Sequence, residues 1–257
     1  MQQVYFKDLG QMDYKAAWDY QEQLLRENVE IKSQLRSLEA ANDSRFTPHA
    51  SPLMSDASRL TIDDSPLTTK HSLLFVEHPP VYTLGKSGKI ENVLISEEER
   101  VSKGISFFYT NRGGDITFHG PQQIVGYPIL DLEKFYTDIG RYMRSIEEVM
   151  ILTMAEYGLK GERSAGETGV WLDPGVKGKE RKIGAIGVRC SRWITMHGFA
   201  FNINTDLHYF DYIIPCGIQN KQVTSLGKEL NRQVDFNEAK EKVKKNFEKV
   251  FDVELMQ

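Results

Sequence analysis

Cys216 lies between a proline and a glycine, in the stretch IIPCGI that spans residues 213–218. A cysteine that only fills a core usually lies inside a strand or a helix, whereas this one sits where the chain must turn. The thiol is therefore a small buried side chain, a metal ligand or a nucleophile. As a nucleophile it needs activation, because a free thiol has a pKa of about 8.5 and is mostly protonated at neutral pH.

Cationic side chains elsewhere in the sequence could activate the thiol, because a nearby positive charge lowers its pKa. The candidates are Lys182, Arg189, Arg192, His119 and His197. A cysteine paired with a lysine suits acyl transfer: the thiolate attacks a thioester or ester, and the amine holds the thiolate and then shuttles a proton. Backbone N–H groups at glycine-rich turns would bind the oxyanion.

The segment RGGDITFHGPQQ, residues 112–123, combines two adjacent glycines with an arginine and a histidine. The glycines let the backbone approach a ligand closely, and Arg112 supplies a positive charge or a hydrogen-bonding fork. Thr117 and His119 alternate with Phe118, so they share one face if the segment is extended. The alternative is a tight hairpin with a histidine packed nearby.

A third segment begins at Lys182 and continues as a strand of small and apolar residues, IGAIGV. Gly184, Ala185 and Gly187 leave one face of that strand open. Such a face either packs against another backbone or forms the floor of a ligand site. Gly198, which follows a histidine, again places a glycine where a substrate could lie close.

Other features argue against several classes of function. The sequence has no C-x-x-C or H-E-x-x-H pair and its histidines are scattered, so we expect no metal site. It has no phosphate-binding glycine motif, which argues against nucleotide chemistry. A net charge of −4 gives no basic excess for nucleic acid or for an anionic membrane surface. No apolar run approaches the ~20 residues that would span a bilayer.

The chain has only two cysteines, Cys190 and Cys216, and its first residues do not resemble a secretory signal. We therefore expect a cytoplasmic protein in which both thiols stay reduced. Cys190 lies within an apolar strand, so we expect it to be a small buried hydrophobic side chain.

The predicted elements indicate how these residues are positioned. Apolar periodicity predicts helices over residues 12–40 and 137–157, the second with methionines that fill the core, and a third helix after a capping Asp235. Residues 41–70 are rich in Ser, Asp, Thr and Pro and are predicted to be a flexible surface insertion. Strands and helices do not alternate regularly, so we expect one α+β domain over residues 1–257. Strands are predicted at residues 73–76, 81–84, 105–110, 124–132, 168–172, 182–190 and 193–204.

The order of several long motifs resembles that of the lipoyl(octanoyl) transferase family. The motifs are LLFVEHPPVYTLGK, RGGDITFHGPQQIVGYPILDL, KIGAIGVR, HGFAFNIN and IIPCGI. The resemblance extends from about residue 72 to residue 220. It implies a mixed β-sheet flanked by helices, similar to the catalytic domains of biotin and lipoate protein ligases.

The resemblance also implies a reaction without a cofactor. An octanoyl group moves from octanoyl-acyl carrier protein to Cys216 as a thioester, and then to a lysine ε-amine on a lipoyl domain. Lys182 is implied to lower the pKa of Cys216, a role that suits a lysine because an arginine keeps its proton and cannot shuttle it. The residues implied to line the acyl pocket are Arg112, Gly113, Gly114, Asp115, Ile116, Thr117, Phe118, His119, Ala185, Ile186, Gly187, Gly198, Phe199 and Ala200.

The implied partners are octanoyl-acyl carrier protein as donor and, as acceptors, lipoyl domains of 2-oxoacid dehydrogenases and the glycine cleavage H protein. A local group of basic residues could dock an acidic carrier, or it could be a solvated hairpin. These residues are Lys177, Lys179, Arg181, Arg189 and Arg192.

Three alternatives remain. An ATP-dependent lipoate or biotin ligase of the same fold needs a nucleotide and no cysteine. A lipoyl-domain amidotransferase differs in its donor. A non-catalytic carrier-binding protein would use Cys216 only structurally.

Overall fold

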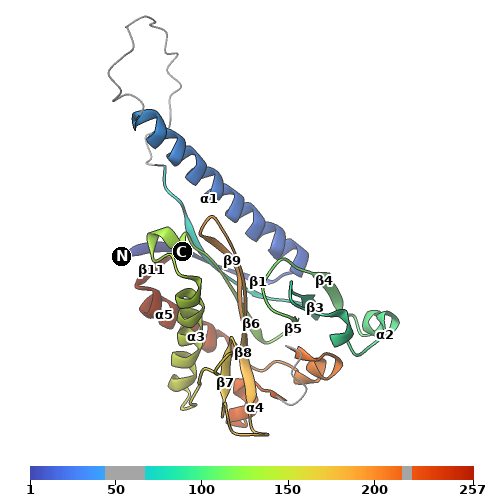
Figure 1. The fold of residues 1–257 in the computed structure, drawn as a ribbon. Helices are drawn as coiled ribbons and strands as arrows, with labels where there is room; N and C mark the ends of the chain where they lie inside the picture. The colour runs from blue at the N-terminus through green and yellow to red at the C-terminus, as the bar shows by residue number, and fades with distance from the viewer. Residues whose placement is uncertain (44–66, 216–221) are drawn as a thin grey trace, which may run out of the picture.

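The computed structural model of the chain describes residues 1–43, 67–215 and 222–257 (Figure 1). Its strands are β1 (Gln2–Gln11), β2 (His71–Glu77), β3 (Val81–Leu84), β4 (Ser106–Tyr109), β5 (Ile116–His119), β6 (Gln123–Ile129), β7 (Val170–Leu172), β8 (Arg181–Ser191), β9 (Ile194–Asn202), β10 (Gln222–Val223) and β11 (Val253–Met256). Its helices are α1 (Tyr14–Asp43), α2 (Glu97–Ser102), α3 (Ile139–Glu156), α4 (Leu226–Leu230) and α5 (Phe236–Phe251), with short 3₁₀ helices η2 (Ile90–Asn92), η3 (Leu132–Lys134) and η4 (Leu207–Tyr212).

The strands of the described ranges form two mixed sheets, which confirms the expected α+β class. The larger has the order β10-β8-β9-β6-β2-β1-β11, with β7 also paired to β8. Its centre is antiparallel from β2 through β6 and β9 to β8, whereas β1 pairs in parallel with both β2 and β11. The smaller sheet has the order β4-β3-β5.

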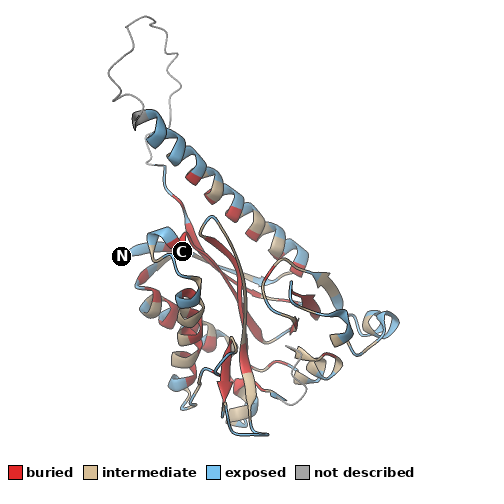
Figure 2. Ribbon diagram, viewed as in Figure 1, coloured by how far each residue is buried: buried red, intermediate tan, exposed pale blue. Residues whose placement is uncertain are grey.

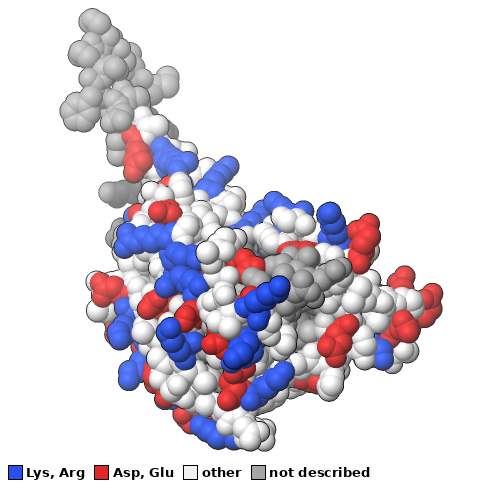
Figure 3. All heavy atoms as spheres, turned by 60° about the horizontal axis from the view of Figure 1, so that its bottom comes forward, with Lys and Arg blue, Asp and Glu red and all other residues white. Residues whose placement is uncertain are grey.

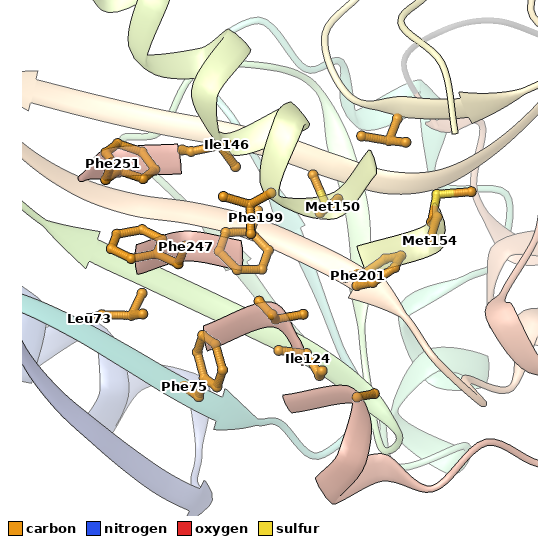
Figure 4. Packing of buried hydrophobic residues seen from close by; sticks show 14 of the residues in the cluster. Leu73, Phe75, Ile124, Ile146, Met150, Met154, Phe199, Phe201, Phe247 and Phe251 are labelled. Carbon is orange, nitrogen blue, oxygen red and sulfur yellow. The ribbon is translucent and has the colours of Figure 1, made fainter. Parts of the chain in front are cut away.

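Helices α3 and α5 cover one face of the larger sheet (Figure 1). Helix α3 begins after Asp138, whose side chain accepts a hydrogen bond from the N–H of Arg141. Met150 and Met154 project from α3 onto the sheet, where they meet Phe199 and Phe201 (Figure 4). The prediction that these methionines fill the core is confirmed, and burying each such side chain contributes about 1.5–3 kcal/mol.

Helix α1 crosses the opposite face of the sheet, and its far end projects beyond it (Figure 1). Buried residues follow one side of the helix from Tyr14 to Lys32 (Figure 2). Three of them are polar, namely Gln21, Asn28 and Lys32. Lys32 Nζ lies 2.8 Å from Asp131 Oδ1, so a buried ion pair joins α1 to the end of the sheet. Helix α1 is thus fixed by specific polar contacts as well as by apolar packing.

The predicted insertion at residues 41–70 lies mostly outside the described residues, but its predicted limits are too wide. Helix α1 continues to Asp43. At the other end, Thr69 Oγ1 donates to Asp131 Oδ2 over 3.0 Å. Asn28 exchanges two hydrogen bonds with the backbone of Lys70. The polar composition of this stretch led to a wrong prediction of flexibility for its end residues, because their partners are distant in the sequence.

Several elements have no counterpart in the sequence-based prediction, among them β1 and α2. Strand β1 exposes most of its side chains and buries only Val4 completely, so it lacks the strong alternation that marks a half-buried strand. Helix α2 is short, but a capping box of Ser96 and Glu99 marks its start and could have been recognised.

The smaller sheet holds the Arg-Gly-Gly segment. Tyr82 and Phe118 form its apolar core with Tyr209 and Phe210 of η4. Residues 110–115 connect β4 to β5 at the edge that faces the larger sheet, where the N–H of Gly113 donates to the carbonyl of Val188 on β8.

Candidate active site

A cavity of about 660 Å³ lies between the two sheets and the start of α1. It brings together nearly all of the residues that the sequence singled out. Those that line it are Arg112, Gly113, Gly114, Asp115, Ile116, Thr117, His119, Lys182, Ala185, Ile186, Gly187, Gly198, Phe199 and Ala200.

Two of the expected site residues are not part of this lining as the structure describes it. Phe118 alternates with Thr117 and His119, as predicted, so its ring points into the core of the smaller sheet and stacks on Tyr209. Cys216 lies outside the described residues. Its neighbour Pro215 lines the cavity, and so does Val223, on the other side of the undescribed residues 216–221.

Arg112 forms one wall of the cavity and is 7% exposed. Its Nη2 donates to the carbonyl and to the hydroxyl oxygen of Thr83, and its Nη1 donates to the carbonyl of Gly113 over 3.0 Å. Gly85 packs so closely on the carbonyl of Gly114 that a Cβ would not fit. The Arg-Gly-Gly segment is therefore a rigid wall held against β3 and the turn after it.

The small residues of β8 serve two purposes. A Cβ on Gly187 would lie 2.9 Å from the carbonyl oxygen of Gly113, and one on Gly184 would lie 2.6 Å from the sulfur of Met150. These glycines thus permit close packing of a backbone and of a core side chain. Ala185, which pairs with Ala200 on β9, leaves open space in the cavity floor.

His119 is buried in a hydrogen-bonded chain. Gln123 Nε2 donates to Phe118 and to Asn202, which leaves its Oε1 to accept from Nδ1–H of His119 over 2.8 Å. The other ring nitrogen lies 3.4 Å from Thr83 Oγ1. Burial, followed by the neighbouring His78, lowers the pKa of His119 to about 3, so the ring is neutral.

Tyr14 and Tyr127 extend the same wall, and the ring of His78 packs against both of them. His78 Nε2 lies 2.8 Å from the hydroxyl of Tyr127, and the Tyr14 ring stacks on that of His119 at 6.1 Å. Burial lowers the pKa of His78 to about 4 and raises that of Tyr14 to about 12. These groups are uncharged at neutral pH and suit an apolar ligand.

His197 has an unusual environment at the cavity. Asn111 donates its amide hydrogen to Glu22, so its Oδ1 accepts from Nε2–H of His197 over 2.7 Å. The buried Nδ1 has no hydrogen-bond partner within the described part of the chain. The backbone is left-handed, with a φ of 56°. Burial, with Arg112 and Arg189 nearby, lowers the pKa of His197 to about 3.

Lys182 stands where β8 pairs with both β7 and β10, opposite Trp171 and Val223. Its Nζ lies 4.8 Å from the centre of the Trp171 ring. The adjoining loop contributes Gly166, Glu167 and Thr168 to the cavity. Lys182 therefore shares one cavity with Pro215 and with the Arg-Gly-Gly wall.

Sequence reasoning missed several lining residues. From the sequence, Tyr14 is placed only within a predicted helix and Tyr127 only within the predicted strand 124–132, and no role is given to Gln123 at the end of the RGGDITFHGPQQ segment. The strand pattern of β6 does indicate that residues 123, 125 and 127 share a face. Nothing local indicates that this face meets the start of α1, because that contact is formed only in the folded chain.

The other expectations for polar residues have mixed outcomes. Cys190 is partly exposed, which corrects the expectation of a buried side chain; partial burial raises its pKa.

Within the proposed basic group, Arg181 pairs with Asp173 and Glu229, and Arg189 pairs with Glu22. Charges of both signs alternate over the face in Figure 3.

The described residues contain neither a metal-binding group nor a membrane-spanning helix. No three His, Cys, Asp or Glu side chains there are grouped so that they could hold a metal ion. Likewise, no helix among those residues has the length and apolar character needed to cross a membrane.

Comparison with known proteins defines first the class of domain. Residues 59–248 match the family model described as the lipoyl protein ligase A/B catalytic domain. The bipartite lipoate protein ligase of Thermoplasma acidophilum is 13% identical with a TM-score of 0.65, covering 100% of this chain and 87% of that one. Lipoate-protein ligase A bound with ATP is 14% identical with a TM-score of 0.60, covering 73% of this chain and 75% of that one. The expected likeness to lipoate ligase domains is confirmed at the level of fold.

Closer relatives define the family. The chain is 52% identical to the octanoyltransferase of Christiangramia forsetii, over 98% of this chain and 97% of that protein. It is 53% identical to the octanoyltransferase of Flavobacterium psychrophilum, over 97% of each. The chain therefore belongs to the octanoyltransferase family, and its activity is that of an acyltransferase in protein lipoylation.

Proposed function

We propose that the chain transfers an octanoyl group from octanoyl-acyl carrier protein to a lysine ε-amine on lipoyl domains, through a thioester on Cys216. One observation carries this mechanism. Lys182 and Pro215, the residue bonded to Cys216, line a single cavity whose floor is opened by Ala185 and Ala200. An apolar chain fits such a floor, and the lysine suits activation of a neighbouring thiol.

The proposed chemistry has two balanced halves. The Cys216 thiolate attacks the donor carbonyl, the carbon–sulfur bond to the carrier breaks, and the carrier sulfur leaves as a thiol with a proton from Lys182. The acceptor amine then attacks the enzyme thioester, its proton passes to the neutral Lys182, and Cys216 leaves again as a thiolate. The product is an amide, and Lys182 is again an ammonium ion.

The proposed acceptors are lipoyl domains of 2-oxoacid dehydrogenases and the glycine cleavage H protein. We place the reaction in the cytoplasm, because a catalytic thiol stays reduced there. The route uses no metal and no nucleotide.

Intact-protein mass spectrometry after mixing with octanoyl-acyl carrier protein, without ATP, tests the covalent route. Wild type is expected to gain one octanoyl group that hydroxylamine removes, and Cys216→Ser is expected to gain none. Wild type that stays unmodified but turns over with lipoate and ATP would contradict the mechanism and favour the ligase chemistry of the same fold.

The pH dependence of thiol alkylation tests the role of Lys182. Lys182→Ala is expected to move the midpoint upward toward that of a free thiol, near ~8.5. Lys182→Arg keeps the positive charge, so its midpoint is expected to stay close to wild type while transfer slows, because an arginine does not release its proton. An unchanged midpoint in Lys182→Ala would remove this residue from the mechanism.

A further inference from the structure

The side chain of Lys182 passes directly over the backbone of Gly169. A Cβ at that glycine would lie 2.8 Å from Lys182 Cε and 3.5 Å from Nζ, and closer still to the carbonyl oxygen of Gly184. Gly169 also has a φ of 120°, a conformation that side chains with a Cβ rarely adopt. Glycine is therefore required here both by conformation and by space.

Gly169 and Trp171 confine the lysine from two directions. The backbone of Gly169 lies under the end of the aliphatic chain, and Nζ lies 4.8 Å from the centre of the Trp171 ring. The main chain of Lys182 is fixed as well, because it pairs with Trp171 on one side and its carbonyl accepts from the N–H of Thr224 on the other. The direction of the ammonium group is thus set by its surroundings.

Gly169 is itself fixed by a buried carboxylate on α3. Its N–H donates to Oε1 of Glu147 over 2.9 Å, and the Glu147 side chain is 0% exposed. Arg144 and Arg163 balance this charge, at 2.9 Å and 3.0 Å. A buried carboxylate with two cationic partners is an expensive arrangement to maintain, and a backbone amide as third partner fixes the loop in a defined place.

The same arrangement reaches the cavity. The residues just before Gly169, namely Gly166, Glu167 and Thr168, line it next to Lys182. The hydrogen bond to Glu147 therefore fixes the end of a cavity-lining loop and the surface on which Lys182 lies.

We infer that Gly169 and Glu147 are positioning residues for Lys182. Gly169 leaves the space that the lysine side chain occupies, and Glu147 keeps Gly169 in that position from the far side of the loop. This inference rests on the proposed role of Lys182 in holding the Cys216 thiolate, because its consequence is a properly directed ammonium group.

The test uses Gly169→Ala and Glu147→Gln in a Cys190→Ser background, which leaves Cys216 as the only cysteine. The measurements are the pH midpoint of alkylation by iodoacetamide, kcat and KM for octanoyl transfer, and circular dichroism to confirm folding. Glu148→Gln is the matched control, because Glu148 also pairs with Arg163 but does not contact Gly169.

Gly169→Ala is expected to raise the alkylation midpoint by about one pH unit. At pH values well below the wild-type midpoint it is expected to lower kcat about tenfold, because one unit changes the thiolate fraction by that factor there. KM is expected to change less. Glu147→Gln is expected to shift both quantities in the same direction but by less, and Glu148→Gln is expected to match the background protein. If Gly169→Ala does not fold, Glu147→Gln alone decides.

Lys182→Ala, measured in parallel, distinguishes failure of the positioning role from failure of the proposed function. If it raises the midpoint while folded Gly169→Ala and Glu147→Gln retain the wild-type midpoint, the positioning role is wrong and the proposed function stands. A fall in kcat of these two variants without a change in their alkylation midpoint would likewise show that Gly169 and Glu147 have only a structural role. If Lys182→Ala itself leaves the midpoint unchanged, the role of Lys182 is wrong and the inference falls with it.

Discussion

Arg112 and Thr83 form a single unit in the cavity wall. Nη2 of Arg112 donates to Thr83 Oγ1 over 2.8 Å and also to the Thr83 carbonyl, and both side chains are buried. Through this pair, the loop before β5 is joined to the middle strand of the smaller sheet. The planar guanidinium makes several bonds at once, which a lysine cannot reproduce.

Arg112→Lys is therefore expected to lower the unfolding free energy by about 1–3 kcal/mol, the usual cost of leaving a buried partner unsatisfied. It is also expected to lower kcat/KM about tenfold or more, because the wall moves relative to the substrate. Urea unfolding and steady-state transfer assays measure the two effects. Wild-type kcat/KM in a folded Arg112→Lys protein would show that the wall does not position the substrate.

Gly187→Ala and Gly184→Ala make a matched pair on β8. The first places a Cβ 2.9 Å from the Gly113 carbonyl oxygen, whereas the second meets the flexible end of Met150 at 2.6 Å. We expect Gly187→Ala to cost about 1–3 kcal/mol of stability and to reduce transfer, because a backbone atom must move. Gly184→Ala is expected to cost less and to retain transfer. Equal effects in both activity and stability would contradict the assignment of Gly187 to the wall.

Three of the buried histidines, whose pKa values are strongly lowered, should make the protein sensitive to mild acid. The pKa of His78 is lowered to about 4, and those of His119 and His197 to about 3, mainly by burial. An unfolded histidine has a pKa near ~6.5, so the unfolded state takes up protons first as the pH falls. Stability is therefore complete above about pH 6.5 and decreases toward the folded pKa values, by about 1.4 kcal/mol per pH unit for each histidine.

Urea unfolding at pH 7, 6 and 5 checks this slope. His119→Gln is expected to reduce the slope of the unfolding free energy against pH by the contribution of one histidine, about 1.4 kcal/mol per pH unit. His208→Gln is expected to leave it unchanged, because the His208 side chain is 88% exposed. A stability that does not change between pH 7 and 5 would contradict burial of the neutral rings.

The ion pair of Lys32 and Asp131 offers a test of how α1 is held. The side chains are 5% and 2% exposed, so Lys32→Met leaves an uncompensated buried carboxylate and is expected to cost about 3–5 kcal/mol. The double variant Lys32→Met with Asp131→Asn is expected to recover part of that loss. Lys15→Met is the control, because its pair with Asp19 is exposed and worth at most ~0.5 kcal/mol.

Local patterns were sufficient to predict much of the fold. The apolar spacing of α3 and α5 and the capping by Asp235 are properties of neighbouring residues, and the structure confirms them. The small residues of β8 were also recognised, but their separate purposes were not. Whether a glycine accommodates a ligand, a sulfur or a carbonyl depends on partners far away in the chain.

The parts that were missed share this dependence on distant partners. Strand β1 has a weak pattern and is specified by β2 and β11, which flank it. Tyr14 becomes a cavity wall only because α1 packs across β6 and β9. Glu147 is an ordinary helix residue in the sequence, and only the fold reveals its bond to Gly169.

The pairing of β1 with β11 has a consequence for synthesis of the protein. Gln2 is in register with Val253, so β1 pairs with a strand that is synthesised much later than itself. One edge of β1 therefore keeps its backbone donors and acceptors exposed until β11 has been synthesised. Exposed strand edges promote pairing between chains. Nascent copies of this protein are expected to need shielding by chaperones during that interval. Deletion of β11, residues Val253–Met256, is expected to make the protein prone to association through β1.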